Sequence, residues 1–172
     1  MTIVLLGVQY SSMSPLRRTK GFDARVNRLI DPDHPCGPVA VALVSYLFGQ
    51  PIGLERACQE IQTDPYGRCS LADLIACLSN HDFGATGIKA NERSIGKIGK
   101  EAVLILYVNH SHFVVIKRNE NGTLVVFDPP QPSMPLGELP YEWGGEAVLV
   151  TESPGHLERA LVALGVPDHT SR

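Results

Sequence analysis

Residues 38–48 (PVAVALVSYLF) form an apolar run that strongly limits how the rest of the chain can fold. The run carries no charge on any face, begins at Pro38 and is followed by Gly49, as expected for a helix that is buried all round. A helix without a charged face must be covered on every side, so the remaining elements have to pack around it. Cys36 and Gly37 stand at its N-terminus.

Two further helices are predicted downstream of this run. Apolar residues recur at helical spacing over residues 54–61, and again from Ser70 onward. Ser70 and Asp73 have the spacing of a capping box, which indicates that the third helix begins at this point. The second half of the chain ends in another amphipathic pattern, over 157–164.

Between these helices the pattern becomes typical of strands. Apolar runs at 102–108, 113–117, 124–127 and 146–150 are predicted to form a mostly antiparallel sheet. Asn121–Gly122 is a strong signal for a tight hairpin. Because the runs are apolar on both alternating faces, we expect cover on both sides of the sheet. Helices followed by antiparallel strands indicate the α+β class.

The size of the chain suits one domain with one core, since it has 172 residues and is 44% hydrophobic. We expect an irregular lead-in over residues 1–35 that packs on the domain, a main domain over 36–150, and a C-terminal helix and tail over 151–172. The net charge is −3, and basic residues are interspersed with acids. Nucleic acid is therefore not an expected partner.

The N-terminal apolar run, residues 3–8, is too short for a signal-peptide core and far too short to span a bilayer. We therefore expect a strand or packed arm there and a cytoplasmic location. In a reducing compartment the four cysteines are expected to be free thiols.

Cys36 is the first candidate for chemistry, because free N–H groups and the helix dipole at a helix N-terminus favour a thiolate. The plainer interpretation, a small buried hydrophobic residue, is kept for Cys58, Cys69 and Cys77.

A nucleophilic cysteine needs a base and a group that orients the base. His112 opens one predicted strand and Asp128 ends its hairpin partner. Across the Asn121–Gly122 turn, paired residues are expected to have numbers that sum to about 243. That register leaves His112 and Asp128 roughly three residues apart along neighbouring strands, which calls for a bulge or a shifted register.

Three short motifs in this order resemble the double-glycine leader peptidases, the papain-like domains that precede bacteriocin-exporting ABC transporters. They are residues 36–40 (CGPVA), 112–115 (HFVV) and 127–129 (FDP). The separations from Cys36 to His112 and from His112 to Asp128 also fit the family, and the similarity covers about residues 31–150.

The resemblance implies a papain-like fold and a cysteine peptidase with Cys36 as nucleophile, His112 as general base and Asp128 as orienting group. It implies a peptide substrate cut after Gly-Gly, a separate transporter as partner, and neither a cofactor nor a metal. The chain departs from the family at two positions. Ile30 stands where the family has an oxyanion-binding Gln, and Pro35 stands where it usually has Asp. Asn27 and His34 are candidates to replace the missing donor.

Three alternatives remain open at this point. A Cys-His-Asp acyltransferase or amidase on the same fold would share the triad. A catalytically weak relative that binds a peptide is motivated by Ile30. A metal site is suggested by His110 and His112, which would face the same side of a strand.

The residue at position 30 leads to the first prediction. An apolar side chain cannot donate to the oxyanion, and one such donor is worth about 100- to 1000-fold in rate. We therefore expect Ile30→Gln to raise the turnover of a Gly-Gly peptide by about tenfold or more, measured by mass spectrometry of the products. Ile30→Leu, which adds no donor, serves as the control. Unchanged turnover in Ile30→Gln would show that another group already fills this role.

Overall fold

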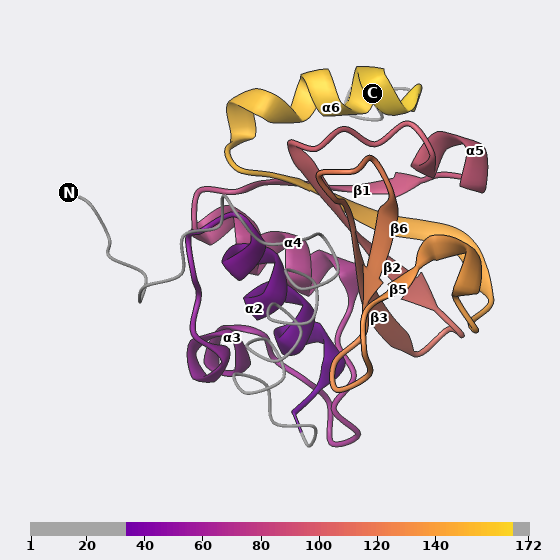
Figure 1. The fold of residues 1–172 in the computed structure, drawn as a ribbon. Helices are drawn as coiled ribbons and strands as arrows, with labels where there is room; N and C mark the ends of the chain where they lie inside the picture. The colour runs from indigo at the N-terminus through magenta and orange to yellow at the C-terminus, as the bar shows by residue number, and fades with distance from the viewer. Residues whose placement is uncertain (1–33, 167–172) are drawn as a thin grey trace, which may run out of the picture.

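The fold is described by a computed structural model for residues 34–166. It has the predicted α+β class, with helices before a mostly antiparallel sheet (Figure 1). The elements, in chain order, are α2 (Cys36–Leu47), α3 (Leu54–Glu60), α4 (Leu71–Asn80), β1 (Gly84–Lys89), α5 (Glu92–Ile95), β2 (Ala102–Val108), β3 (His112–Arg118), β4 (Leu124–Phe127), β5 (Met134–Pro135), the 3-10 helix η2 (Leu136–Glu138), β6 (Trp143–Thr151), the 3-10 helix η3 (Pro154–His156) and α6 (Leu157–Leu164).

The predicted buried helix is α2, and its interior residues Val41 and Val44 have no exposed surface. Helices α3 and α4 pack beside it on one face of the sheet, as Figure 1 shows. The predicted capping box is present at the start of α4. There the Ser70 hydroxyl accepts from the Asp73 N–H, and the Asp73 carboxylate accepts from the Ser70 N–H.

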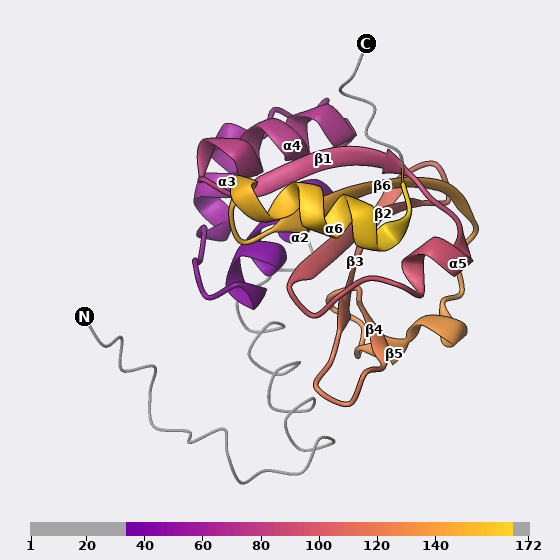
Figure 2. The same ribbon diagram turned by 90° about the horizontal axis from the view of Figure 1, so that it is seen from above.

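The sheet has six strands in the order β1-β6-β2-β3-β4-β5, and every neighbouring pair is antiparallel. Two core clusters lie on opposite faces of it. One joins the sheet to α2, α3 and α4, and the other joins it to α5 and α6. Figure 2 shows α6 lying across the sheet on the face away from α2. The prediction of a sheet covered on both faces is therefore confirmed.

The hairpin register differs from the predicted one by a single residue. Val115 pairs with Phe127 and Arg118 with Leu124, so paired numbers sum to 242. Because successive side chains point to opposite faces, a shift of one residue moves a side chain to the other face. The predicted register was wrong, and the difference decides whether Asp128 and His112 lie on the same face of the sheet.

The other differences concern lengths and short elements. Strand β6 is longer than the predicted 146–150, and β1, β5 and α5 were not predicted. The predicted C-terminal helix is α6, which ends at Gly165 with a φ of 67°, a left-handed conformation that favours glycine. The expected arm at 3–8 and most of the lead-in lie outside the described residues. Within residues 34–166, none of the helices is long and apolar enough to cross a membrane.

Gly37 stands at a close approach between α2 and the segment before α4. A Cβ at this position would lie 2.2 Å from the Cys69 sulfur and 3.2 Å from a methyl carbon of Leu74. Only glycine fits between these atoms, which lets the N-terminus of α2 approach the chain around Cys69.

The second prediction follows from this contact. Gly37→Ala is expected to lower the free energy of unfolding by about 1–3 kcal/mol, because the added methyl group overpacks the site. Gly155→Ala is the matched control, since a Cβ at Gly155 meets nothing within 4 Å. Denaturant unfolding measures both variants. Cys69→Ala in the Gly37→Ala background should recover part of the loss; equal losses with and without Cys69 would show that the clash lies elsewhere.

Candidate active site

Cys36 is the first residue of α2 and lies beside the N-terminal end of strand β3. Its sulfur is 4.0 Å from the carbonyl oxygen of Ser111, in the turn that precedes β3. The side chain is only partly buried. The long buried helix thus holds a thiol beside the first residues of β3, where the helix dipole stabilises negative charge.

His112 and Asp128 are joined by a direct hydrogen bond, with 2.7 Å between Nε2 and Oδ1. Continuing the observed register by one residue beyond β4 places Asp128 opposite Val114, two residues from His112 on the same face. Such diagonal neighbours are within reach across two strands. The register expected from the sequence called for a bulge or a shift, and the observed shift of one residue supplies the contact.

Tyr141 completes this group from the loop before β6, and the sequence analysis missed it. Its hydroxyl donates to Asp128 Oδ2 at 2.6 Å. Its ring meets the His112 ring edge-on, with centroids 5.6 Å apart and an angle of 73°. Asp128 is therefore held through both oxygens. No local pattern distinguishes Tyr141 from the other tyrosines, because its partners lie in distant segments.

The charges of Cys36 and His112 support each other. Burial raises the pKa of the Cys36 thiol, but hydrogen bonds from His112 and from backbone N–H groups outweigh it, so the pKa lies below its usual value. The hydrogen bond to Asp128, with a further one to Cys36, raises the pKa of His112 to about 9. Together these shifts favour the charged forms of both groups, a thiolate beside an imidazolium.

The Asp128 carboxylate remains ionised although only 5% of its surface is exposed. Burial raises its pKa, but hydrogen bonds from His112 and Tyr141 outweigh that effect and lower it. The bond to Asp128 raises the pKa of Tyr141 to about 12, so the phenol keeps its proton and remains a donor. Because Nε2 of His112 is engaged by Asp128, Nδ1 is the ring nitrogen left to face Cys36.

A cavity of ≈ 350 Å³ opens beside these groups. Cys36, His112, Asp128 and Tyr141 line its polar part, together with His34, which the sequence analysis named as a candidate donor. Apolar side chains from α2 and the sheet line another part: Val39, Ala40, Leu43, Phe113, Val115 and Phe127. Pro129, Pro130 and Gln131, from the segment after β4, complete the lining. Ile30 and Asn27 lie outside the described residues.

The other candidates lie elsewhere. His110 is in the turn before β3, with a φ of 53°, so the expectation that it shares a strand face with His112 was wrong. The turn starts after Val108 and redirects the chain before His112. Cys58, Cys69 and Cys77 are free thiols like Cys36, but burial raises the pKa of each, for Cys69 and Cys77 to about 12.

Comparison with known proteins identifies relatives of this arrangement. The model of the peptidase C39 family matches residues 31–155. A similar solved structure is a double glycine motif protease from an AMS/PCAT transporter in complex with the leader peptide. It is 20% identical, with a TM-score of 0.56, over 67% of this chain and 83% of that chain. The peptidase domain of Streptococcus ComA, a bi-functional ABC transporter, is also 20% identical, with a TM-score of 0.56, over 71% of this chain and 93% of that chain. No match was found among curated proteins. The two structures share the fold.

The third prediction concerns the reactivity of the four thiols. At pH 6 iodoacetamide is expected to modify Cys36 before Cys58, Cys69 or Cys77, because only Cys36 has a lowered pKa and therefore a larger thiolate fraction than the other three. His112, with a pKa of about 9, is protonated at this pH and stabilises the thiolate. Peptide mass spectrometry measures the rate at each site.

Two controls separate ionisation from exposure. Denatured protein gives the intrinsic rate of each thiol when all are equally accessible. His112→Ala should slow the labelling of Cys36 at pH 6 and leave the other sites unchanged. If Cys36 labels no faster than the other cysteines, or is indifferent to His112→Ala, the pair does not activate the thiol.

Proposed function

The chain belongs to the peptidase C39 family, and on this basis we propose that it is a cysteine peptidase that uses Cys36, His112 and Asp128 as its catalytic groups. The observation that carries the proposal is the hydrogen bond between His112 and Asp128, in the same cavity as a thiol of lowered pKa. A nucleophile, a base and a group that orients the base are thus gathered around one space.

In the proposed reaction the Cys36 thiolate attacks the carbonyl carbon of the scissile peptide bond. The carbon–nitrogen bond then breaks, and His112 gives its proton to the leaving amine, which leaves a thioester on Cys36. Water attacks the thioester while His112 accepts a proton from it. Release of the carboxylate product then restores the thiolate and imidazolium.

Asp128 and Tyr141 act on His112 in this scheme. Asp128 accepts from Nε2, which fixes the ring with Nδ1 toward Cys36 and stabilises the imidazolium. Tyr141 is a positioning residue, because it holds the second oxygen of Asp128 and packs against the ring. The arrangement keeps the base from rotating away from the thiol.

The oxyanion formed during attack needs donors near the thiol. The backbone N–H of Cys36, the first residue of α2, is a candidate donor, because the first N–H groups of a helix lack intrahelical partners. His34 and Gln131 line the same cavity, and each carries a side-chain N–H group that can assist. This donor set would differ from the family's Gln, whose place is taken by Ile30.

The proposed substrate is a peptide with a Gly-Gly leader, the class that the name of one structural neighbour describes. Two residues without side chains next to the scissile bond add little bulk to the part of the peptide that must approach Cys36. The apolar lining contributed by Val39, Leu43 and Val115 suits an aliphatic side chain elsewhere in the peptide. A transporter that exports the processed peptide is the partner that this activity implies.

The fourth prediction tests the reaction on a synthetic peptide with an internal Gly-Gly. Mass spectrometry should show cleavage directly after the second glycine, and a peptide with Ala-Val in place of Gly-Gly should stay intact. Cys36→Ala should abolish the cleavage, and His112→Ala should lower kcat by about 100-fold or more, since proton transfer contributes at least that factor. Cleavage that persists in Cys36→Ala would exclude Cys36 as the nucleophile.

Water labelled with ¹⁸O and an added amine distinguish the alternatives on this fold. Hydrolysis places the label in the new carboxylate, whereas an acyltransferase gives the amide of the added amine. Peptide binding without either product, at protein concentrations that exceed the peptide, would identify a peptide-binding relative instead.

A further inference from the structure

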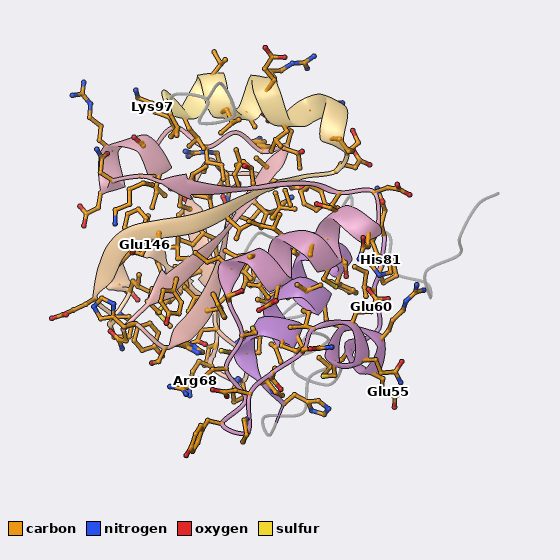
Figure 3. The ribbon with its side chains drawn as sticks, turned by 180° about the vertical axis from the view of Figure 1, so that it is seen from behind. Glu55, Glu60, Arg68, His81, Lys97 and Glu146 are labelled. Carbon is orange, nitrogen blue, oxygen red and sulfur yellow. The ribbon has the colours of Figure 1, made fainter. Side chains whose placement is uncertain are left out.

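A second cluster of reactive side chains joins α3 to α4, outside the cavity that contains Cys36. Glu60 ends α3, Cys77 lies on α4, and His81 caps the C-terminus of α4. Cys77 and His81 are four residues apart, so both face the same side of the helix. Figure 3 shows Glu60 and His81 side by side, from two helices.

The donor atoms of this cluster converge on one point. One oxygen of Glu60, Oε2, lies 2.8 Å from His81 Nε2 and 3.5 Å from the Cys77 sulfur. All three donor atoms lie within 4.8 Å of one another. A tetrahedral zinc, with bonds of about 2.0–2.3 Å, separates its ligand atoms by roughly 3.3–3.7 Å. Small side-chain movements would bring the three atoms to that spacing.

The chemistry of the three donors also matches one kind of ion. A thiolate, an imidazole and a carboxylate are the ligands that zinc takes in proteins, whereas magnesium and calcium prefer oxygen alone. A thiolate and a carboxylate together balance the charge of a divalent cation. The three side chains therefore form a neutral site with Zn²⁺.

The surroundings of the cluster orient Glu60 and leave one side open. Arg56 donates to the other oxygen of Glu60, Oε1, at 2.7 Å, which keeps Oε2 turned toward Cys77 and His81. Cys77 is buried, but the side chains of Glu60 and His81 are 26% and 16% exposed. Solvent therefore reaches the outer side of the cluster, where a water molecule can serve as the fourth ligand.

We propose that Glu60, Cys77 and His81 bind Zn²⁺, with water in the fourth position, and that the ion ties α3 to α4. Helix α3 has seven residues, too few to be stable alone, and in the structure the cluster is one of its links to α4. The role is structural and independent of the proposed peptidase reaction.

The fifth prediction tests this site in tag-free, full-length Cys36→Ala protein. That background is needed because Cys36, His112 and Asp128 offer a second set of sulfur, nitrogen and oxygen donors. Zn²⁺ is expected to bind with one-to-one stoichiometry in competition with a chromogenic chelator and to raise the Tm relative to protein in EDTA. Co²⁺ should give a thiolate-to-cobalt charge-transfer band and the visible absorption typical of a tetrahedral site.

Variants with matched controls assign the ligands. Glu60→Gln and His81→Gln should each weaken Zn²⁺ binding by at least about tenfold, since losing even an outer-sphere partner costs 10- to 100-fold. Cys77→Ser should remove the charge-transfer band. Because Cys77 is buried, this substitution can also disturb the core, and Glu60→Gln, at an exposed position, tests the site without that effect. Two control variants should change neither the Zn²⁺ affinity nor the charge-transfer band. Glu55→Gln removes the same charge from α3 at a position apart from the cluster in Figure 3, and Cys58→Ser removes a thiol outside the cluster.

Two outcomes would overturn the proposal. One is the absence of one-to-one Zn²⁺ binding at micromolar concentrations in the Cys36→Ala protein. The other is Zn²⁺ binding that Glu60→Gln and His81→Gln leave unchanged. If both variants lower the Tm equally with Zn²⁺ and with EDTA, the cluster is a hydrogen-bonded link between two helices.

Discussion

Helix α2 packs against strand β3 through side chains that include Leu43 on the helix and Val115 on the strand. Because α2 has no charged face, it can exist only beneath such a cover, and the sheet with α3 and α4 supplies it. This packing also fixes the N-terminus of the helix beside the first residues of β3. Cys36 thus reaches His112, although 76 residues separate them in the chain. On its other side, the same end of the helix approaches Cys69 and Leu74 closely, which Gly37 permits because it has no side chain.

The second requirement is that His112, the proposed base, stays oriented. The hydrogen bond from His112 to Asp128 depends on the alternation of side chains along β3 and β4, which places both on one face. Tyr141 then holds the second carboxylate oxygen from the loop before β6. Burial alone would raise the pKa of Asp128 and of Cys36, and the hydrogen bonds reverse both effects. The charged state of the whole group therefore depends on its geometry.

The helical layer contains both the candidate active site and the proposed zinc site, yet the two use different parts of it. Cys36 lies at the N-terminus of α2, where the helix dipole favours an anion. His81 and Glu60 lie at the C-terminal ends of α4 and α3. An ion that joins these ends would stiffen the layer that packs on α2 without touching the cavity beside Cys36. The zinc proposal rests on the donor atoms of Glu60, Cys77 and His81 in this chain.

The sequence by itself determined the buried helix, the capped third helix, the strands β2, β3, β4 and β6, and the α+β class, because these follow from local periodicity and capping. It also singled out Cys36, His112 and Asp128 through short motifs. Only the tertiary structure decided the contact between His112 and Asp128. The paired residue numbers of β3 and β4 sum to 242 and not to the predicted 243, and this shift of one residue changes which face a residue occupies. Tyr141 and the Glu60–Cys77–His81 cluster were likewise decided there. Their partners come from separate elements, and no local pattern records which elements will meet.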